Sequence, residues 1–172
     1  MEFIRLTSPD DERFLGAMEI YEASFPFHEQ REVLSQRGIM DEDDYHFDLI
    51  CVGGVFSGLM LYWETDGFIY LEHFCIHPRM RSRGLGTQAL EALKARGKAV
   101  ILEIDPPEND TALCRLGFYE KNGFVINDRA HIHPPYHAMY PGHRLCVMTH
   151  PAELTDAEYA AFSDYLSGVV MA

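Results

Sequence analysis

The decisive stretch of this sequence is His77-Pro78-Arg79-Met80-Arg81-Ser82-Arg83-Gly84-Leu85-Gly86-Thr87. Three arginines stand at alternate positions, and two glycines follow one residue apart. Beyond them, one face of a helix carries apolar side chains at Leu85, Ala89, Ala92 and Leu93, and Gly97 stands where that helix would end. The first amides of a helix have no partner within it, carry the positive end of its dipole and commonly bind phosphate. The stretch therefore predicts an anion-binding turn that opens a helix.

The sequence before this turn predicts antiparallel strands. Segments 45–52 and 55–63 flank Gly53-Gly54, a two-residue hairpin signal, and Asp66-Gly67 leads into a third strand over 68–76. After the helix, segment 99–104 is apolar on both faces, which is typical of a central strand. Strand, helix and strand in that order predict a right-handed parallel crossover. The expected fold class is α+β, with a mixed, mostly antiparallel central sheet and flanking helices.

The two ends of the chain add further elements. We expect a first strand over 2–7, a helix capped by Ser8 or Asp10, and a second helical stretch over 29–36. Beyond the central strand we expect a helix over 111–121, then strands over 124–126 and 144–149 separated by a long insertion, 127–143. A capping box of Thr155 and Glu158 predicts a helix at the C-terminal end.

Composition limits the class of protein. A chain of 172 residues with 47% apolar side chains fits one globular domain over residues 1–172. The net charge of −13 argues against binding to nucleic acid or to an acidic membrane surface, and no apolar run approaches the length of a membrane span. Four cysteines are scattered without a Cys-x-x-Cys pair, so we expect reduced thiols in a cytoplasmic protein.

Two motifs carry a resemblance to a known family. Arg81, Gly84 and Gly86 resemble the acyl-CoA loop of the GNAT superfamily of N-acetyltransferases, whose pattern is Gln/Arg-x-x-Gly-x-Gly/Ala. Phe118-Tyr119-Glu120-Lys121-Asn122-Gly123-Phe124 is similar to the family segment Phe/Leu-Tyr-x-x-x-Gly-Phe. The resemblance implies a GNAT-type fold, with the parallel βαβ crossover at the cofactor loop, and acetyl-CoA as co-substrate. It implies direct transfer of the acetyl group to a primary amine in a ternary complex.

The resemblance also assigns cofactor contacts. In the family, the loop amides hold the pyrophosphate of acetyl-CoA, and the strand before the loop offers backbone groups to the pantetheine arm and the thioester. Many members have an asparagine seven residues before the tyrosine, whereas here it stands ten residues before. The implied cofactor-binding residues are Cys75, Ile76, Arg81, Ser82, Arg83, Gly84, Leu85, Gly86, Thr87 and Asn109.

Tyr119 is the implied catalytic acid. In the family the tyrosine hydroxyl points at the thioester sulfur and protonates the departing thiolate. The chemistry is reasonable, because a phenol with a pKa near ~10 stays protonated at neutral pH and a thiolate with a pKa near ~8–9 accepts its proton late in the reaction. The alternative is that Tyr119 is a core aromatic.

Glu72 is the first candidate for the catalytic base. In an unbulged strand it shares a face with Phe68, Tyr70, Phe74 and Ile76, so we expect burial to raise its pKa toward a useful value. Several GNAT branches have a glutamate base on the corresponding strand, often acting through water. His73 and Glu103 are alternative bases, and a rim charge or a satisfied buried pair is the alternative to catalysis.

The acceptor site is expected near two segments. Ser24 to Arg31 is similar to the first-helix region that shapes the acceptor pocket in some GNATs. The insertion carries His131, His133, Tyr136 and His137, and we expect it to border the acceptor cleft. A zinc site on His131-x-His133 is an alternative, but no Cys or carboxylate completes it at a usual spacing, so we expect no required metal. The candidate substrate-binding residues are Phe27, His28, Arg31, His73 and Tyr136.

Partners and competing functions remain open at this point. The acceptor is either a small-molecule amine or a protein amine, and the protein is either a monomer or a homodimer. A non-catalytic acyl-CoA-binding module would keep the loop but lack a base or a correctly placed Tyr119. Gly84-x-Gly86-x-x-Ala89 with Asp105 also fits a dinucleotide fingerprint. Against that function stand the seven residues between Ile76 and Gly84 and the antiparallel strands upstream.

Overall fold

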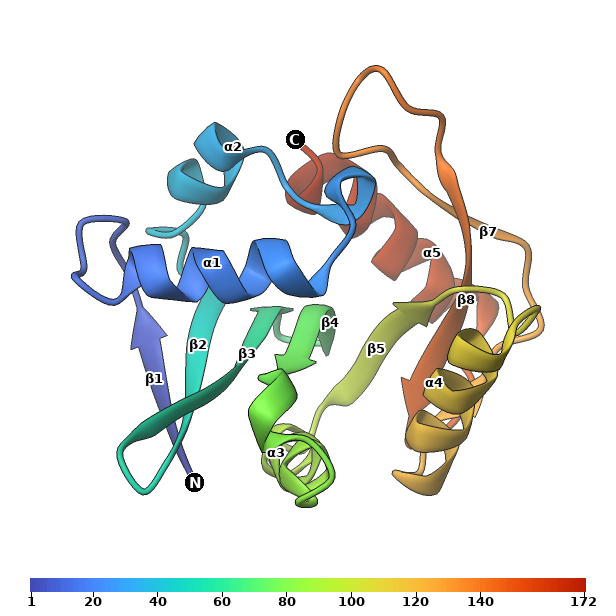
Figure 1. The fold of residues 1–172 in the computed structure, drawn as a ribbon. Helices are drawn as coiled ribbons and strands as arrows, with labels where there is room; N and C mark the ends of the chain where they lie inside the picture. The colour runs from blue at the N-terminus through green and yellow to red at the C-terminus, as the bar shows by residue number, and fades with distance from the viewer.

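The computed structural model describes all residues from Met1 to Ala172. One sheet organises the chain, in the strand order β1-β2-β3-β4-β5-β8-β6, with β7 paired to β8 (Figure 1). The strands are β1 (Glu2–Leu6), β2 (Tyr45–Val52), β3 (Val55–Glu64), β4 (Phe68–Ile76), β5 (Ala99–Ile104), β6 (Val125–Ile126), β7 (His131–His133) and β8 (His143–His150). The α-helices are α1 (Phe14–Ser24), α2 (Val33–Gly38), α3 (Leu85–Lys94), α4 (Asp110–Lys121) and α5 (Asp156–Tyr165). Short 3-10 turns are η1 (Phe27–Glu29) and η2 (Pro78–Met80), and a π-helical turn, Leu166–Val170, extends α5.

The sheet confirms the predicted fold class. Every neighbouring pair of strands is antiparallel except β4 and β5, which are parallel and are joined through α3. The Gly53-Gly54 hairpin joins β2 to β3, and both glycines have positive φ angles, 58° and 76°. The expected anion-binding turn lies between the parallel strands, at the start of α3.

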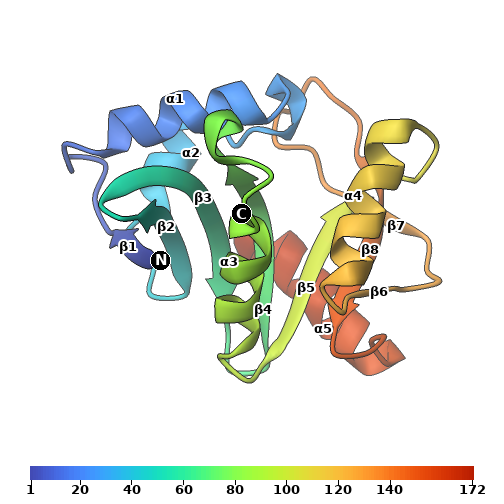
Figure 2. The ribbon, with the colours of Figure 1, turned by 60° about the horizontal axis from the view of Figure 1, so that its bottom comes forward.

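The parallel pair is short, and its strands then diverge. Only Phe68–Leu71 of β4 pairs with Ala99–Leu102 of β5, and Figure 2 shows the two strands separating beyond that point. Glu72 and Glu103 are the first residues of each strand past the last pair, Leu71 with Leu102. On its other side β4 carries a bulge, because Leu61 of β3 pairs with His73 while Tyr62 pairs with Leu71. Glu72 therefore has no cross-strand partner.

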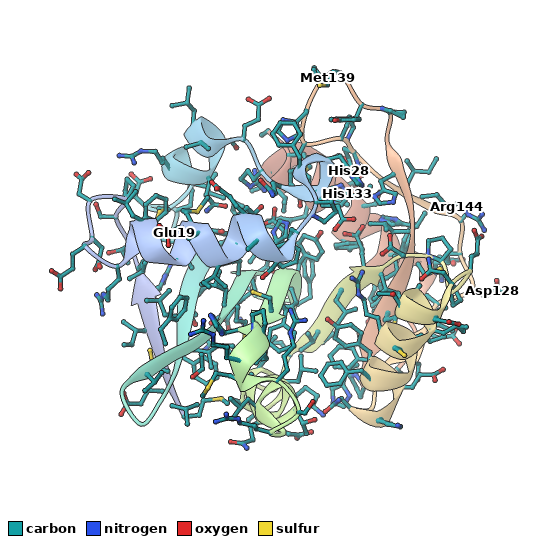
Figure 3. All side chains as sticks on the ribbon, in the orientation of Figure 1. Glu19, His28, Asp128, His133, Met139 and Arg144 are labelled. Atoms are coloured by element: carbon teal, nitrogen blue, oxygen red, sulfur yellow. The ribbon has the colours of Figure 1, made fainter.

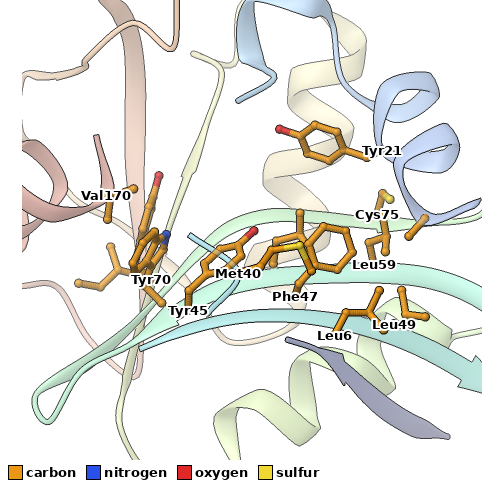
Figure 4. Packing of buried hydrophobic residues seen from close by; sticks show 14 of the residues in the cluster. Leu6, Tyr21, Met40, Tyr45, Phe47, Leu49, Leu59, Tyr70, Cys75 and Val170 are labelled. Carbon is orange, nitrogen blue, oxygen red and sulfur yellow. The ribbon is translucent and has the colours of Figure 1, made fainter. Parts of the chain in front are cut away.

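Two hydrophobic clusters cover the two faces of the sheet. The larger one packs α1, α5 and the π-helical turn against the sheet, and Figure 4 shows Tyr21, Phe47, Tyr70 and Cys75 among its residues. The smaller one packs α3 and α4 against the opposite face through residues such as Leu90. Burial on both faces explains why the 99–104 segment is apolar at every position except Glu103.

Two local expectations need correction. Helix α1 begins at Phe14, after Arg13, and neither Ser8 nor Asp10 caps it, because the Ser8 hydroxyl accepts from the Asp10 amide in the preceding turn. The expected helix over 29–36 is instead η1 followed by α2. The Thr155–Glu158 capping box of α5 is confirmed. No helix has both the length and the apolar character needed to cross a bilayer.

Phe162 offers a test of how α5 docks. Its ring is fully buried, with its centroid 5.2 Å from that of Tyr70 and 6.1 Å from that of Phe68. We expect Phe162→Ala to lower the free energy of unfolding by about 3–5 kcal/mol, since it removes buried surface and leaves a cavity. Leu34→Ala is the control, because Leu34 is 84% exposed and its loss should change stability by less than about 0.5 kcal/mol. Equal effects in urea denaturation would contradict this docking.

Candidate active site

The glycine turn presents open backbone amides. Ser82 and Gly84 have positive φ angles of 61° and 73°, a conformation that glycine adopts without strain, and α3 begins directly afterwards. The amides of Leu85, Gly86 and Thr87 have no acceptor within the chain. At Gly86 a Cβ would lie 3.1 Å from the Phe118 ring, so glycine lets α3 approach α4 closely. The turn thus has the donors and the shape of an anion site.

One cavity connects this turn to the far side of the sheet. It has a volume of about 770 Å³ and passes between the diverging ends of β4 and β5 to the insertion. At one end lie the backbone of the glycine turn and Tyr119 of α4, and at the other lie η1, Tyr136 and the start of β8. Figure 3 labels His28, on the turn after α1, and His133, and both line this second end.

Most of the expected cofactor contacts line the cavity, and two do not. The lining includes Cys75, Ile76, Arg81, Ser82, Gly84, Leu85, Gly86 and Thr87. Arg83 is exposed and donates to the Arg79 carbonyl. Asn109 caps α4, where its side chain accepts from the Ala112 amide 2.9 Å away. The geometry therefore gives Asn109 a structural partner and does not favour it as a cofactor contact.

Tyr119 lies where an acid could act. Its ring is buried against Phe118 and Phe124, yet the residue lines the cavity and its hydroxyl makes no hydrogen bond within the chain. Burial raises the pKa of Tyr119 to about 12, and the nearby charge of Arg115 opposes that rise. The phenol is therefore protonated at neutral pH and has a proton to give.

Glu72 is surrounded by hydrogen-bond donors and a positive charge, not by the apolar side chains that we expected. Glu72 keeps the face of Tyr70, as expected, but the bulge moves Phe74 and Ile76 to the opposite face, where they pack in the smaller cluster. Its carboxylate accepts from an Arg31 guanidinium nitrogen at 2.7 Å, from the Trp63 indole at 2.7 Å and from the Tyr136 hydroxyl at 2.9 Å.

These partners decide the charge state of Glu72. Burial by itself raises the pKa of the Glu72 carboxyl, but the charges of Arg31 and His73 and the donated hydrogen bonds outweigh burial and lower it to about 2. The expectation of a raised pKa is wrong. Its role as a base stays a prediction, which this saturated ion pair does not favour.

Glu103 and His73 are the other two candidates for the base. Glu103 accepts from the Tyr70 hydroxyl at 2.5 Å and contacts His131. Burial raises its pKa, but these hydrogen bonds and the neighbouring imidazoles leave it lowered. His73 is buried beside Tyr21, with Nε2 2.8 Å from the Glu29 carbonyl, and burial lowers its pKa so that the ring is neutral at pH 7.

The expected acceptor residues separate into two groups. His28, His73 and Tyr136 line the cavity. Phe27 is 57% exposed and stacks on His137, outside the cavity lining. Arg31 is buried behind Glu72, where it holds the carboxylate instead of contacting the cavity.

The family assignment follows from comparison with known proteins. The model of the Acetyltransferase (GNAT) family matches residues 14–124, which is more than half of the chain and includes both motifs. The chain belongs to the GNAT acetyltransferase family. The match includes the diverging parallel pair and the open turn before α3, and it does not support the dinucleotide alternative.

Individual GNAT relatives agree with this assignment. A solved structure described as "Putative acetyltransferase from GNAT family", from Bacteroides thetaiotaomicron, is 27% identical, covers 99% of this chain and 98% of that one, and has a TM-score of 0.92. "Putative acetyltransferase YjbC" of Bacillus subtilis (strain 168) is 28% identical over 107 residues, or 58% of this chain. That match spans about half, 52%, of the length of YjbC. The ribosomal-protein-S18-alanine N-acetyltransferase of Escherichia coli, 18% identical with a TM-score of 0.58 over 90% of this chain and 95% of that one, shares the fold.

The sequence reasoning missed three cavity residues of this GNAT protein. Glu29 follows His28 in a segment already assigned to the acceptor pocket, so its position in that segment was an available signal. Asp105 follows the end of β5 and was considered only for a dinucleotide, and His143, at the end of the insertion, was given no role. All three line the cavity, together with Tyr136 and the start of β8.

The Glu72–Arg31 pair generates a stability prediction. We expect Glu72→Gln to lower the free energy of unfolding by about 3–5 kcal/mol at pH 7, because it leaves the buried Arg31 charge uncompensated. The pKa of Glu72 is depressed in the folded state, so its contribution is complete above its ordinary value of 4.5 and is lost as the pH falls toward about 2. Denaturant unfolding at several pH values should show the wild-type advantage shrinking over that range.

A surface pair provides the control for this measurement. Glu91 is 61% exposed and pairs with Lys94 at 2.6 Å, so Glu91→Gln should cost less than about 1 kcal/mol. A wild-type advantage over Glu72→Gln that stays constant from pH 7 to pH 2 would contradict a depressed pKa at Glu72.

Proposed function

We propose that this protein transfers an acetyl group from acetyl-CoA to a primary amine by direct attack in a ternary complex. One observation carries the proposal: the open amides before α3 and the unpartnered phenol of Tyr119 line the same cavity as a group of carboxylates and imidazoles. A Bacillus subtilis acetyltransferase of the same fold, 13% identical with a TM-score of 0.55, was solved in complex with CoA, which supports an acyl-CoA ligand.

The proposed cofactor position follows from the two kinds of donor along the cavity. The pyrophosphate binds the free amides of Leu85, Gly86 and Thr87, helped by the positive charge of Arg81. Past Leu71, the edge of β4 that faces β5 has no strand partner, so its backbone is available to the pantetheine arm. An amide on this edge near Cys75 would stabilise the oxyanion that forms when the thioester is attacked.

The chemical step needs one acid and one base. The neutral amine attacks the thioester carbonyl, the new C–N bond forms and the C–S bond breaks. Tyr119 donates its proton to the departing thiolate, while a base accepts the proton that the amine loses. No acyl-enzyme intermediate is required, because the amine itself receives the acetyl group.

For the base, we propose Glu29 in place of Glu72. The Glu29 carboxylate lines the cavity and makes no hydrogen bond, so its lone pairs are available. Burial and the nearby negative charge of Asp105 raise the pKa of Glu29, which makes its carboxylate more basic than an ordinary one. Glu72 would then serve to hold Arg31 and Tyr136 in place.

The acceptor class stays within the original prediction. A small-molecule amine or a protein amine would both place a cationic group at an end of the cavity that carries Glu29 and Asp105. The oligomeric state, monomer or homodimer, and the cytoplasmic location also stay predictions.

Tyr119→Phe tests the acid. We expect turnover in a thiol-release assay with a panel of amines to fall by about 10²–10⁴-fold, because the proton donor is gone. Acetyl-CoA should still raise the melting temperature of the variant, since the loop is intact. Tyr165→Phe is the matched control: its hydroxyl bonds Asp44 at 3.1 Å outside the cavity, so turnover should be unchanged.

The same assay separates the proposal from a non-catalytic binder. Unchanged turnover in Tyr119→Phe would remove Tyr119 from the mechanism. Acetyl-CoA binding without thiol release from any amine in the wild-type protein would instead indicate an acyl-CoA-binding module.

Glu29→Gln tests the base through its pH profile. A base must be ionised, so we expect wild-type kcat/KM to rise with pH through the raised pKa of Glu29. In the variant, this rise of kcat/KM with pH should disappear, and kcat/KM should fall by about 10²–10⁴-fold. Glu32→Gln is the control, because Glu32 is 59% exposed and outside the cavity lining. A wild-type profile in Glu29→Gln would return the role to Glu72, Glu103, His73 or water.

A further inference from the structure

Three metal-binding side chains converge at the acceptor end of the cavity. His28 and Glu29 belong to η1, and His143 begins β8, far away in the sequence. One donor atom from each residue lies within 4.8 Å of the other two. All three residues line the cavity, so they meet in an open space and not in packed core.

None of these three side chains has a hydrogen-bond partner within the chain. The imidazole of His28 lies 3.6 Å from the Glu29 carboxylate, too far for a hydrogen bond. The side chain of His28 is 44% exposed and that of Glu29 is 28% exposed. His143 is 35% exposed, and its Nε2 lies 3.6 Å from Asp105 Oδ1. The side chains are therefore free to move toward a common ligand.

The electrostatics of this cluster favour a cation. Glu29 and Asp105 both line this part of the cavity, so two carboxylates lie near the two imidazoles. Arg115 compensates only part of this charge, through its 2.8 Å bond to Asp105 Oδ2. The other oxygen of Asp105 is the one that faces His143.

The histidines that the sequence singled out do not share these properties. His131 contacts Glu103 and lies 2.8 Å from the Tyr159 hydroxyl through its other nitrogen. Nδ1 of His133 lies 2.5 Å from the Pro134 carbonyl. Both rings are buried, and because both nitrogens of His131 have partners, the pair offers only Nε2 of His133 to an ion.

We propose that His28, Glu29 and His143 bind one Zn²⁺ ion per chain, with Asp105 beside the fourth coordination position. Two imidazole nitrogens and a carboxylate oxygen are a usual ligand set for zinc. Tetrahedral ligands at about 2.0–2.1 Å from an ion lie about 3.3–3.4 Å apart. The three donor atoms, which lie within 4.8 Å of one another, must therefore move closer together to bind it. The ion would join η1 to β8 across the acceptor end of the cavity.

Zinc at this place would inhibit acetyl transfer. It would occupy acceptor space and take up the carboxylate that we propose as the base, without touching the glycine turn at the other end. Only this consequence rests on the proposed function, whereas the binding of the ion does not.

Direct binding tests the site. Full-length protein without a histidine tag, stripped with EDTA, should bind Zn²⁺ at one ion per chain in calorimetry, and Co²⁺ should give the visible absorption of a four-coordinate site. His143→Ala and Glu29→Gln should each weaken Zn²⁺ binding by at least about tenfold, since even outer-shell changes cost 10–100-fold. His46→Gln is the control, because His46 also lies 3.7 Å from a carboxylate, Glu64, but has no second imidazole nearby.

Each outcome decides the proposal. One-to-one binding that is lost in His143→Ala and Glu29→Gln but kept in His46→Gln supports it. Absence of stoichiometric binding, or equal affinity in all four proteins, overturns it.

Turnover gives a separate readout. Zn²⁺ should raise the KM for the amine while leaving the acetyl-CoA thermal shift unchanged, and His143→Ala should need about tenfold more Zn²⁺ for the same effect. If no amine is acetylated, the proposed function fails while the calorimetry still decides the metal site. If amines are acetylated and no zinc binds, the metal site alone fails.

Discussion

The structure depends on the point where β4 and β5 stop pairing. Up to Leu71 and Leu102 the two strands share hydrogen bonds, and beyond that they separate. A buried sheet cannot simply open, because each freed backbone group loses a partner. Here the two strands separate around a cavity, and polar side chains such as Glu72, Glu103 and Tyr136 line it. These side chains give the cavity its candidate chemistry.

After the last paired residues, Leu71 and Leu102, the next residue on each strand is a glutamate. Different donors stabilise the negative charge of each one. Glu72 is held by Arg31, Trp63 and Tyr136, which come from three separate parts of the chain. Glu103 is held by Tyr70 and His131. Two carboxylates that would otherwise repel across the gap are thus fixed by their own donors. This leaves the less enclosed carboxylate, Glu29, with a pKa raised rather than lowered.

Local signals allowed most of the fold to be predicted, and long-range contacts explain what was missed. The Gly53-Gly54 hairpin, the turn at Gly84 and the capping box at Thr155 are each set by a few neighbouring residues, and each formed as expected. The bulge at Glu72 has no such signal, because it arises from the register between β3 and β4. Once it forms, the alternation of side chains changes: Phe74 and Ile76 move to the opposite face, and Glu72 is left with Arg31 and Tyr136 as partners.

The two ends of the cavity differ in how much of them the family match covers. The proposed cofactor end is built from the crossover and its glycine turn, which the family model covers. The proposed acceptor end takes Tyr136 and His143 from the region after residue 124, which that match does not include. Because Tyr136 bonds Glu72 and His143 lies beside Asp105, the insertion sets the charge around the acceptor as well as its shape. Under the proposed function, we therefore expect the insertion and η1 to select the amine, while the crossover serves any acceptor equally well.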